Sequence, residues 1–136
     1  MIWCVDPGAV ETGVAGWDGN EHNAVWEQFA NPLEVWYSLT ELMRLSDTLL
    51  VEDYTHGGAF TVEAKRTIEV LGFIRLTAKY HGYTVVVRGK DRRLSGQGPA
   101  ARVMGDSIAA LKKDPKRKDA FSALSHCMTY YREVNG

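Results

Sequence analysis

Residues Ile2-Trp3-Cys4-Val5-Asp6-Pro7-Gly8 form the segment around which we expect the whole chain to be organised. Four apolar residues lead directly into a carboxylate and then into Pro-Gly, a pair that interrupts regular structure. A short apolar run bounded by turn residues predicts a strand buried on both faces. Asp6 would then lie at the carboxyl end of this strand, where open α/β sheets bind their ligands. Burying an acid is costly without a cation or hydrogen-bond donors, so Asp6 is either a metal ligand or the cap of the turn.

Two further strands, over 12–18 and 24–29, are expected beside the first one. Thr12-Gly13 opens the second strand, and Asp18-Gly19-Asn20 is typical of a hairpin turn because its residues tolerate positive φ angles. The three strands would form an antiparallel meander. Such a meander is not stable alone, so a layer of helices must cover it.

The rest of the chain alternates between helices and strands, which predicts an α/β protein with a five-stranded mixed sheet flanked by helices. The strand that follows the first helix ends in Glu52 and Asp53, just as the first strand ends in Asp6. The expected elements are a helix from Asn31-Pro32 to about Leu45, a strand at 48–51, a helix over 61–80, a strand at 83–87, a mobile basic loop over 88–98, a helix from Pro99 to about Lys112, and a final helix that Asp114-Pro115 begins and that runs to about Glu133.

The composition is that of one globular domain spanning residues 1–136. Hydrophobic residues make up 45% and charged residues 24%, which excludes a disordered or fibrous chain. No apolar run approaches the roughly 20 residues needed to span a bilayer. No basic segment precedes the first apolar residues, so we expect a cytoplasmic protein without a signal peptide. Cys4 and Cys127 are far apart and lack metal-type spacing, which predicts buried, reduced thiols.

The charge is unevenly distributed, although the net charge is only −1. Residues 88–118 contain ten basic and three acidic residues, a local net charge of +7, so the remainder of the chain carries −8. Such a one-sided stretch favours contact with a polyanion, and solvated helix faces are the alternative explanation.

The helix predicted over 61–80 is apolar on two sides. One stripe, consisting of Val70, Leu71, Ile74 and Ala78, would face the sheet. The second stripe consists of Phe73, Leu76 and Tyr80. Either the second stripe forms a subunit interface, or both stripes lie within one wide buried face.

A third acid, Asp119, lies in the first turns of the final helix, before a run of small and apolar residues suited to close docking on a sheet. Asp6, Glu52 and Asp119 can therefore converge at one end of the sheet. Converging carboxylates repel one another unless divalent cations neutralise them, and oxygen ligands favour Mg²⁺ or Mn²⁺. Two such ions could activate water for phosphodiester hydrolysis.

In this ordered set of motifs the chain resembles the RuvC-type Holliday junction resolvases of the ribonuclease H-like superfamily. The resemblance covers nearly the whole chain. Within the family, the chain resembles the phage-type members. The motifs that carry it are Asp6-Pro7-Gly8 with Thr12-Gly13, Val51-Glu52, Leu71-Gly72 in the long helix, and Asp119-Ala120 through His126.

The resemblance implies a homodimer that pairs through the long helix, with Phe73, Leu76 and Tyr80 at its interface. It also implies cleavage of branched DNA (Holliday junctions, flaps or forks) that depends on Mg²⁺, with two ions per site and Mn²⁺ as a substitute. Asp6, Glu52 and Asp119 match the catalytic acids of the family and would hold the ions.

Two positions depart from the family pattern. Lys116 stands where a fourth metal ligand is usual, so three acids suffice, or Asp114 substitutes, or Lys116 contacts the scissile phosphate. We favour three acids, with Asp114 as a helix cap. Thr55 stands where an aromatic residue is usual, beside Tyr54, which leaves strict sequence preference open.

Basic side chains of the charged segment are candidates for phosphate contacts, which are salt-dependent and independent of base sequence. His126 matches a family position, but it lies about two turns beyond Asp119, so we interpret it as structural. The candidate DNA-binding residues are Tyr54, Lys90, Arg92, Arg93, Arg102 and Lys116.

Three other functions are rivals to this interpretation. A ribonuclease H acting on RNA–DNA hybrids would use the same ions. A junction-binding protein without catalytic activity would account for Lys116 in place of an acid. A nucleotide-binding domain of the actin-like class would use the Asp6-Pro7-Gly8 turn for phosphate, but it needs a second lobe, for which 136 residues leave no room.

Overall fold

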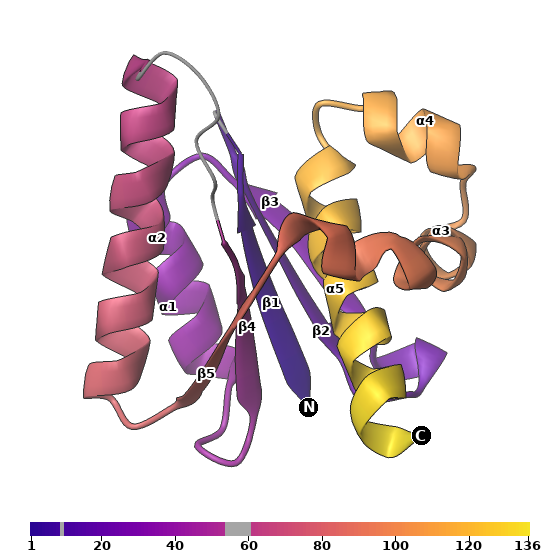
Figure 1. Ribbon diagram of the computed structural model, residues 1–136, viewed down its shortest axis with the longest axis horizontal. Coiled ribbons are helices and arrows are strands. Elements are labelled where there is room, and N and C mark those ends of the chain that lie inside the picture. Colours follow the sequence, from indigo (N-terminus) through magenta and orange to yellow (C-terminus); the bar gives the residue numbers. More distant parts are fainter. Residues whose placement is uncertain (9, 54–60) are drawn as a thin grey trace.

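The computed structural model describes residues 1–8, 10–53 and 61–136. Within them it contains a five-stranded sheet with helices on both faces (Figure 1). The strands are β1 (Ile2–Pro7), β2 (Thr12–Trp17), β3 (Val25–Phe29), β4 (Thr48–Glu52) and β5 (Thr84–Arg88). The α-helices are α1 (Pro32–Leu42), α2 (Val62–Tyr80), α3 (Gln97–Met104), α4 (Ile108–Lys113) and α5 (Lys118–Asn135), with short 3₁₀ helices η1 (Glu21–Asn23) and η2 (Lys90–Gly96).

The sheet has the strand order β3-β2-β1-β4-β5. β1, β2 and β3 pair antiparallel, as the predicted meander requires, whereas β4 and β5 run parallel to β1. The chain folds this way locally because Asp18 accepts a hydrogen bond from the N–H of Asn20 and Gly19 adopts a φ of 95° in the turn after β2. The mixed five-stranded sheet is therefore confirmed.

The helices form two layers, one on each face of the sheet. α1 and α2 cover one face, and α5 covers the other, with η2, α3 and α4 packed beside it (Figure 1). Polar side chains begin two of these helices, since Asn31 accepts from the N–H of Leu33 at the start of α1 and Thr61 accepts from that of Ala64 at the start of α2.

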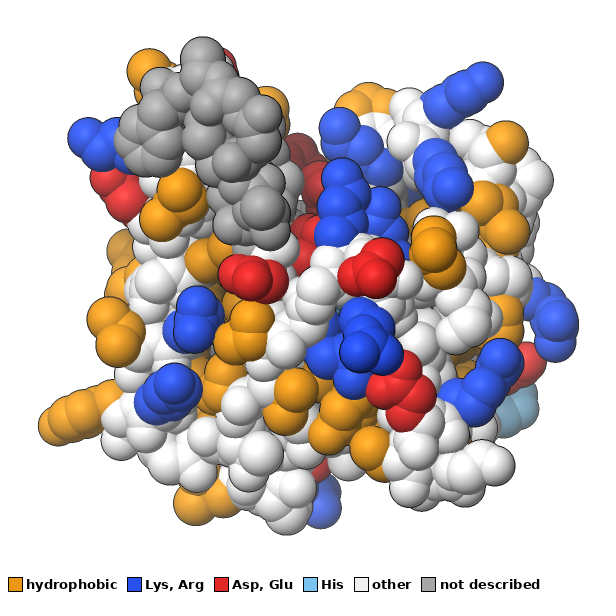
Figure 2. Space-filling view, viewed as in Figure 1, with side chains coloured by type: hydrophobic (Ala, Val, Ile, Leu, Met, Phe, Trp, Pro, Cys, Tyr) orange, Lys and Arg blue, Asp and Glu red, His pale blue; other side chains and the backbone are white. Residues whose placement is uncertain are grey.

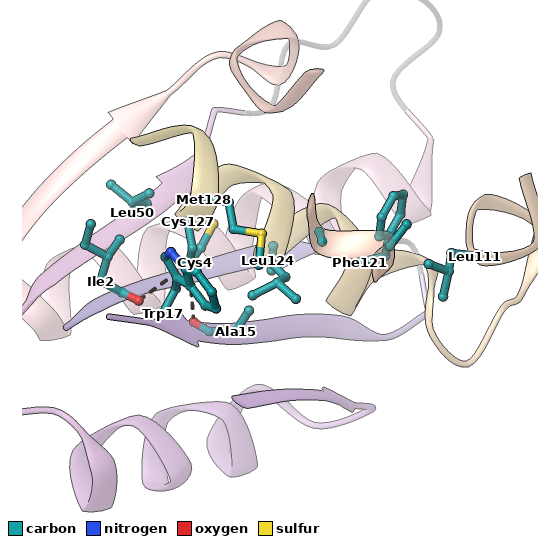
Figure 3. Packing of buried hydrophobic residues seen from close by; sticks show 13 residues of the cluster. Ile2, Cys4, Ala15, Trp17, Leu50, Leu111, Phe121, Leu124, Cys127 and Met128 are labelled. Carbon is teal, nitrogen blue, oxygen red and sulfur yellow. Dashed lines mark hydrogen bonds between the residues drawn. The ribbon is translucent and has the colours of Figure 1, made fainter. Parts of the chain in front are cut away.

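Alternation along β1 separates two hydrophobic cores. Trp3 and Val5 belong to the core under α1 and α2, whereas Ile2 and Cys4 belong to the core under α5. In the second core, the Cys127 thiol of α5 lies against the β1–β2 pair and reaches the carbonyl of Ile2 (Figure 3). Both cysteines are buried free thiols, as expected.

The segment between β5 and α5 differs from the sequence-based expectation. The predicted loop over 88–98 contains the 3₁₀ helix η2, whose last residue, Gly96, is buried against α5. The single helix expected from Pro99 to about Lys112 is wrong, because Gly105 adopts a φ of 77° and ends α3, and Ser107 then caps α4. Two helices replace one.

The final helix begins later than predicted, at Lys118 rather than at Asp114-Pro115. Asp114 is the C-terminal cap residue of α4, and its carboxylate accepts hydrogen bonds from the backbone N–H of Lys116 and from Nε of Arg117. Arg117 also pairs with Asp106, so one guanidinium joins both ends of the α4 segment.

α2 buries one stripe and exposes the other. Ile74 and Ala78 are fully buried, whereas Leu76 is 72% exposed and Tyr80 is 89% exposed, and Phe73 is also exposed. The alternative of one wide buried face is therefore wrong. No helix in the described part of the chain is both long and apolar enough to cross a lipid bilayer.

Candidate functional site

Asp6 and Glu52 lie side by side at the ends of two neighbouring strands. β1 and β4 run parallel, and Val5 pairs with Val51, so the next residues along each strand are the two acids. Asp6 follows the alternation of Ile2 and Cys4, and Glu52 follows that of Leu50, which all face α5. The sheet therefore directs both carboxylates toward α5.

Asp119 joins them because two glycines let the first turn of α5 approach the strands closely. A Cβ atom on Gly13 would lie 2.1 Å from the backbone carbon of Asp119, and one on Gly8 would lie 2.7 Å from its Oδ2. Gly13 is itself the β2 partner of Asp6. The Pro7-Gly8 turn and Gly13 thus make the space that Asp119 occupies.

Gln28 of β3 holds the start of α5 from the other side. Its Oε1 accepts from the backbone N–H of Asp119 at 2.8 Å and from that of Ala120 at 3.1 Å. Its Nε2 donates to Glu11 at 2.8 Å and to the carbonyl of Pro115 at 3.0 Å. Since Arg117 at the helix start offers no side-chain cap, Gln28 satisfies N–H groups that would otherwise lack a partner.

The three acids line one cavity of about 480 Å³. Figure 2 shows it as a hollow with acidic side chains inside and Lys and Arg side chains along the α3–α4 side. The cavity is lined by Asp6, Pro7, Glu52, Asp53, Lys90, Arg93, Gln97, Lys112, Lys118, Asp119, Phe121 and Ser122.

Glu52 has several side-chain partners within the protein. Its Oε2 lies 2.9 Å from Nε2 of His126 and 3.4 Å from the Ser122 hydroxyl, and its Oε1 lies 3.5 Å from Nη1 of Arg93. Ser122 and His126 both come from α5, one helical turn apart. His126 is fully buried, and its Nδ1 has no partner among the described residues.

The pKa values of the acids are shifted in opposite directions. Burial raises the pKa of Asp6 well above its usual value, and the neighbouring Glu52 charge adds to this. Burial also raises the pKa of Asp119 to about 6. Burial would raise the pKa of Glu52 too, but His126 and Arg93 outweigh it and hold that pKa below its usual value.

The donor chemistry fits a hard divalent cation. Three carboxylates from three elements share one cavity, and burial raises the pKa values of two of them, Asp6 and Asp119, by disfavouring the charged form. Across residues 1–8, 10–53 and 61–136, however, no three Asp, Glu, His or Cys side chains already form a closed metal-binding group. The three acids fit such a cation by type and share one cavity, but their side chains are not arranged around one point.

The predicted DNA-binding residues are divided by the structure. Lys90 and Arg93 line the cavity, whereas Arg92, Arg102 and Lys116 are exposed outside it. Asp114 does not line the cavity either. Tyr54 lies outside the described residues.

Sequence reasoning missed several residues of the site. His126, which we interpret as structural, is buried and does not line the cavity, but it contacts Glu52, because a position seven residues beyond Asp119 returns to the same face of α5. That periodicity was the available signal. Lys112 and Lys118 also line the cavity, whereas Gln28 carries no local signal at all.

Comparisons with known proteins relate the whole chain to junction resolvases at the level of fold. No protein-family model and no curated protein matches it by sequence. T. thermophilus RuvC in complex with Holliday junction substrate aligns with a TM-score of 0.68 at 14% identity, over 99% of this chain and 96% of RuvC. A second Thermus thermophilus RuvC structure gives 0.65 at 18% identity, over 98% of this chain and 96% of that chain. Fowlpox virus resolvase in complex with its substrate Holliday junction DNA gives 0.63 at 14% identity over 99% of each chain.

Proposed function

We propose that this protein is an endodeoxyribonuclease that cleaves branched DNA, with Holliday junctions as the main substrate. The observation that carries the proposal is the cavity itself, in which Asp6, Glu52 and Asp119 face lysine and arginine side chains. The fold supports it, because the aligned RuvC and fowlpox resolvase structures include complexes with junction DNA and extend over nearly the whole chain.

Asp6, Glu52 and Asp119 would hold Mg²⁺ at this site, with Mn²⁺ as a substitute. Bound divalent ions of this kind supply an activated water and charge stabilisation for phosphodiester hydrolysis, and two per site is the arrangement we propose. His126 and Ser122 orient the Glu52 carboxylate from α5, and Gln28 fixes the position of Asp119 along the helix axis. These residues hold the acids in place before substrate arrives.

The lysine side chains on the wall of the cavity would bind the DNA backbone, and we call them the DNA-binding wall. Lys90, Lys112 and Lys118 line the cavity beside the acids. Lysine binds phosphate as a point charge, so these contacts are sensitive to salt and indifferent to base sequence. Because these contacts do not read bases, selection of a junction would depend on how the shape of the branched DNA fits the cavity.

We also propose a homodimer, in which the exposed stripe of α2 forms the contact between subunits. Phe73, Leu76 and Tyr80 expose apolar surface on one side of this helix. A row of exposed apolar side chains along one side of a helix favours association. Two subunits would place two cavities on two strands of one junction.

The test is cleavage of a synthetic four-way junction with and without Mg²⁺ by the wild type, Asp6→Asn and Glu52→Gln. Both variants should lose cleavage while retaining junction binding in a gel-shift assay, because the DNA-binding wall is unchanged. Asp114→Asn, which alters an acid outside the cavity, is the matched control and should cleave normally. Cleavage retained by the Asp6 and Glu52 variants would contradict the proposal.

The same assay separates the two rival activities. An RNA–DNA hybrid of matched sequence tests for ribonuclease H activity, because the same acids could serve either substrate. Preferential cleavage of the hybrid would replace the junction as substrate. Junction binding with no Mg²⁺-dependent product under any condition would instead identify a binding protein.

A further inference from the structure

Both carboxylate oxygens of Glu52 already have partners within the protein. Oε2 faces His126 and Ser122, and Oε1 faces Nη1 of Arg93 at 3.5 Å. Nη1 of Arg93 also donates to the Ser122 hydroxyl at 3.2 Å. A cation that bound Glu52 in this arrangement would have to compete with the guanidinium group for Oε1.

Arg93 stands out among the basic residues of the cavity. Among the residues that the structure describes, it is the one Lys or Arg side chain that forms an ion pair with Asp6, Glu52 or Asp119. Its side chain is 20% exposed, so it contacts Glu52 and also lines the open cavity. Its backbone is held nearby, because Gly96 at the end of η2 packs against the Ser125 carbonyl of α5.

We propose that Arg93 is a positioning residue that occupies Glu52 in the free protein and transfers to a DNA phosphate when substrate binds, which frees Glu52 for the divalent cation. This inference rests on the proposed nuclease function and adds an order of assembly to it. A guanidinium group suits the exchange, since its planar fork matches carboxylate and phosphate equally well.

The length of the contact supports an exchange rather than a permanent bond. A separation of 3.5 Å is at the long limit for a hydrogen bond, so little is lost when Arg93 leaves Glu52. Linkage then requires reciprocity: DNA raises the affinity for the cation, and the cation raises the affinity for DNA by the same factor.

The first experiment measures Mn²⁺ binding to the DNA-free protein by isothermal titration calorimetry. Arg93→Gln should bind Mn²⁺ about fivefold tighter or more than the wild type, the lower limit of typical coupling between sites. Lys90→Gln is the matched control, because it removes the same charge from the same cavity without an ion pair to Glu52. An equal gain in both variants would show general electrostatics and overturn the inference.

The second experiment measures junction affinity by fluorescence anisotropy in Ca²⁺ and in EDTA. Ca²⁺ should strengthen junction binding by the wild type and by Lys90→Gln, and much less by Arg93→Gln, because the exchange has been removed. An undiminished Ca²⁺ effect in Arg93→Gln would overturn the inference. Arg93→Lys keeps the charge without the fork, so it should give an intermediate effect and serves if Arg93→Gln does not fold.

The outcomes also separate this inference from the function beneath it. A wild type that binds no Mn²⁺ and cleaves no junction overturns both. A wild type that cleaves junctions with Mg²⁺, together with an Arg93→Gln variant no different from Lys90→Gln, overturns the exchange alone.

Discussion

The side-chain oxygen of Gln28 accepts the backbone N–H of Asp119 at 2.8 Å, although the two residues lie 91 positions apart in the chain. An edge strand thus caps the helix that carries a candidate metal ligand. The contact joins the stability of the fold to the geometry of the site, because the same N–H groups begin α5 and fix where Asp119 points.

Gln28→Ala should therefore destabilise the protein by about 1–2 kcal/mol, the usual cost of losing a helix cap and its buried partners. The measurement is urea unfolding followed by circular dichroism. Glu27→Ala is the control, since Glu27 is the exposed neighbour on the same strand and should change the free energy of unfolding little. Equal effects of the two substitutions would show that the cap contributes nothing.

Gly13→Ala should be more severe, because its new methyl carbon would lie 2.1 Å from the backbone of Asp119. Neither backbone can move away cheaply, so we expect a loss of about 3 kcal/mol or more and weaker Mn²⁺ binding. Gly72→Ala in α2 meets no atom within 4 Å and should be neutral or stabilising by about 0.5–1 kcal/mol. Thermal unfolding of both variants gives the comparison, and a benign Gly13→Ala would contradict this packing.

Asp119→Asn should stabilise the cation-free protein above pH 6. Burial raises the pKa of Asp119 from 3.8 to about 6, so the folded state keeps a proton that the unfolded state has lost between these values. The free energy of unfolding of the wild type therefore falls as the pH rises through this window. The variant escapes that loss, and its gain should be on the order of 1 kcal/mol at pH 7 after allowing for partial exposure, and absent below about pH 4.

Asp114→Asn provides a control of opposite sign. Arg117 holds the pKa of Asp114 below its usual value, so that carboxylate stabilises the fold at neutral pH and its removal should destabilise it. Unfolding in urea at pH 4, 5.5 and 7 measures both variants. A gain in Asp119→Asn that is the same at all three pH values would contradict the assigned protonation.

Leu76→Glu should convert the proposed dimer to a monomer without unfolding it, since Leu76 is 72% exposed and a charge there is poorly tolerated in an apolar contact. Sedimentation velocity measures the change in mass. Leu94→Glu, at an exposed apolar residue of η2, is the control and should leave the assembly unchanged. A wild type that sediments as a monomer would contradict the dimer itself.

Local sequence patterns were sufficient to predict the sheet and the strand ends at which Asp6 and Glu52 lie. The apolar runs that end in Asp6 and Glu52 are strands, and their period of two residues directs both side chains to one face. Contacts between distant segments could not be predicted in this way. The contact of Gln28 in β3 with α5 and that of Arg93 with Glu52 depend on how the elements pack, which no short motif encodes.

Turn chemistry explains the errors of segmentation. Gly105 followed by Ser107 contained the signal for one helix ending and another beginning, but we expected a single helix from Pro99 to about Lys112. Asp114-Pro115 had the composition of a helix start and serves instead as the end of α4. In both places the residue types are common at helix ends and helix starts alike, and their position relative to the neighbouring helix decided which of the two they formed.

The central role of α5 has a consequence for how the protein matures during synthesis. α5 follows every strand that the structure describes, and it brings Asp119, Ser122 and His126 to Asp6 and Glu52, which are made much earlier. During synthesis the β1–β4 surface would therefore be exposed for most of translation, and the acidic cavity would stay incomplete until α5 is made. If the protein is the proposed nuclease, prematurely terminated chains that lack this helix would be unable to cleave DNA.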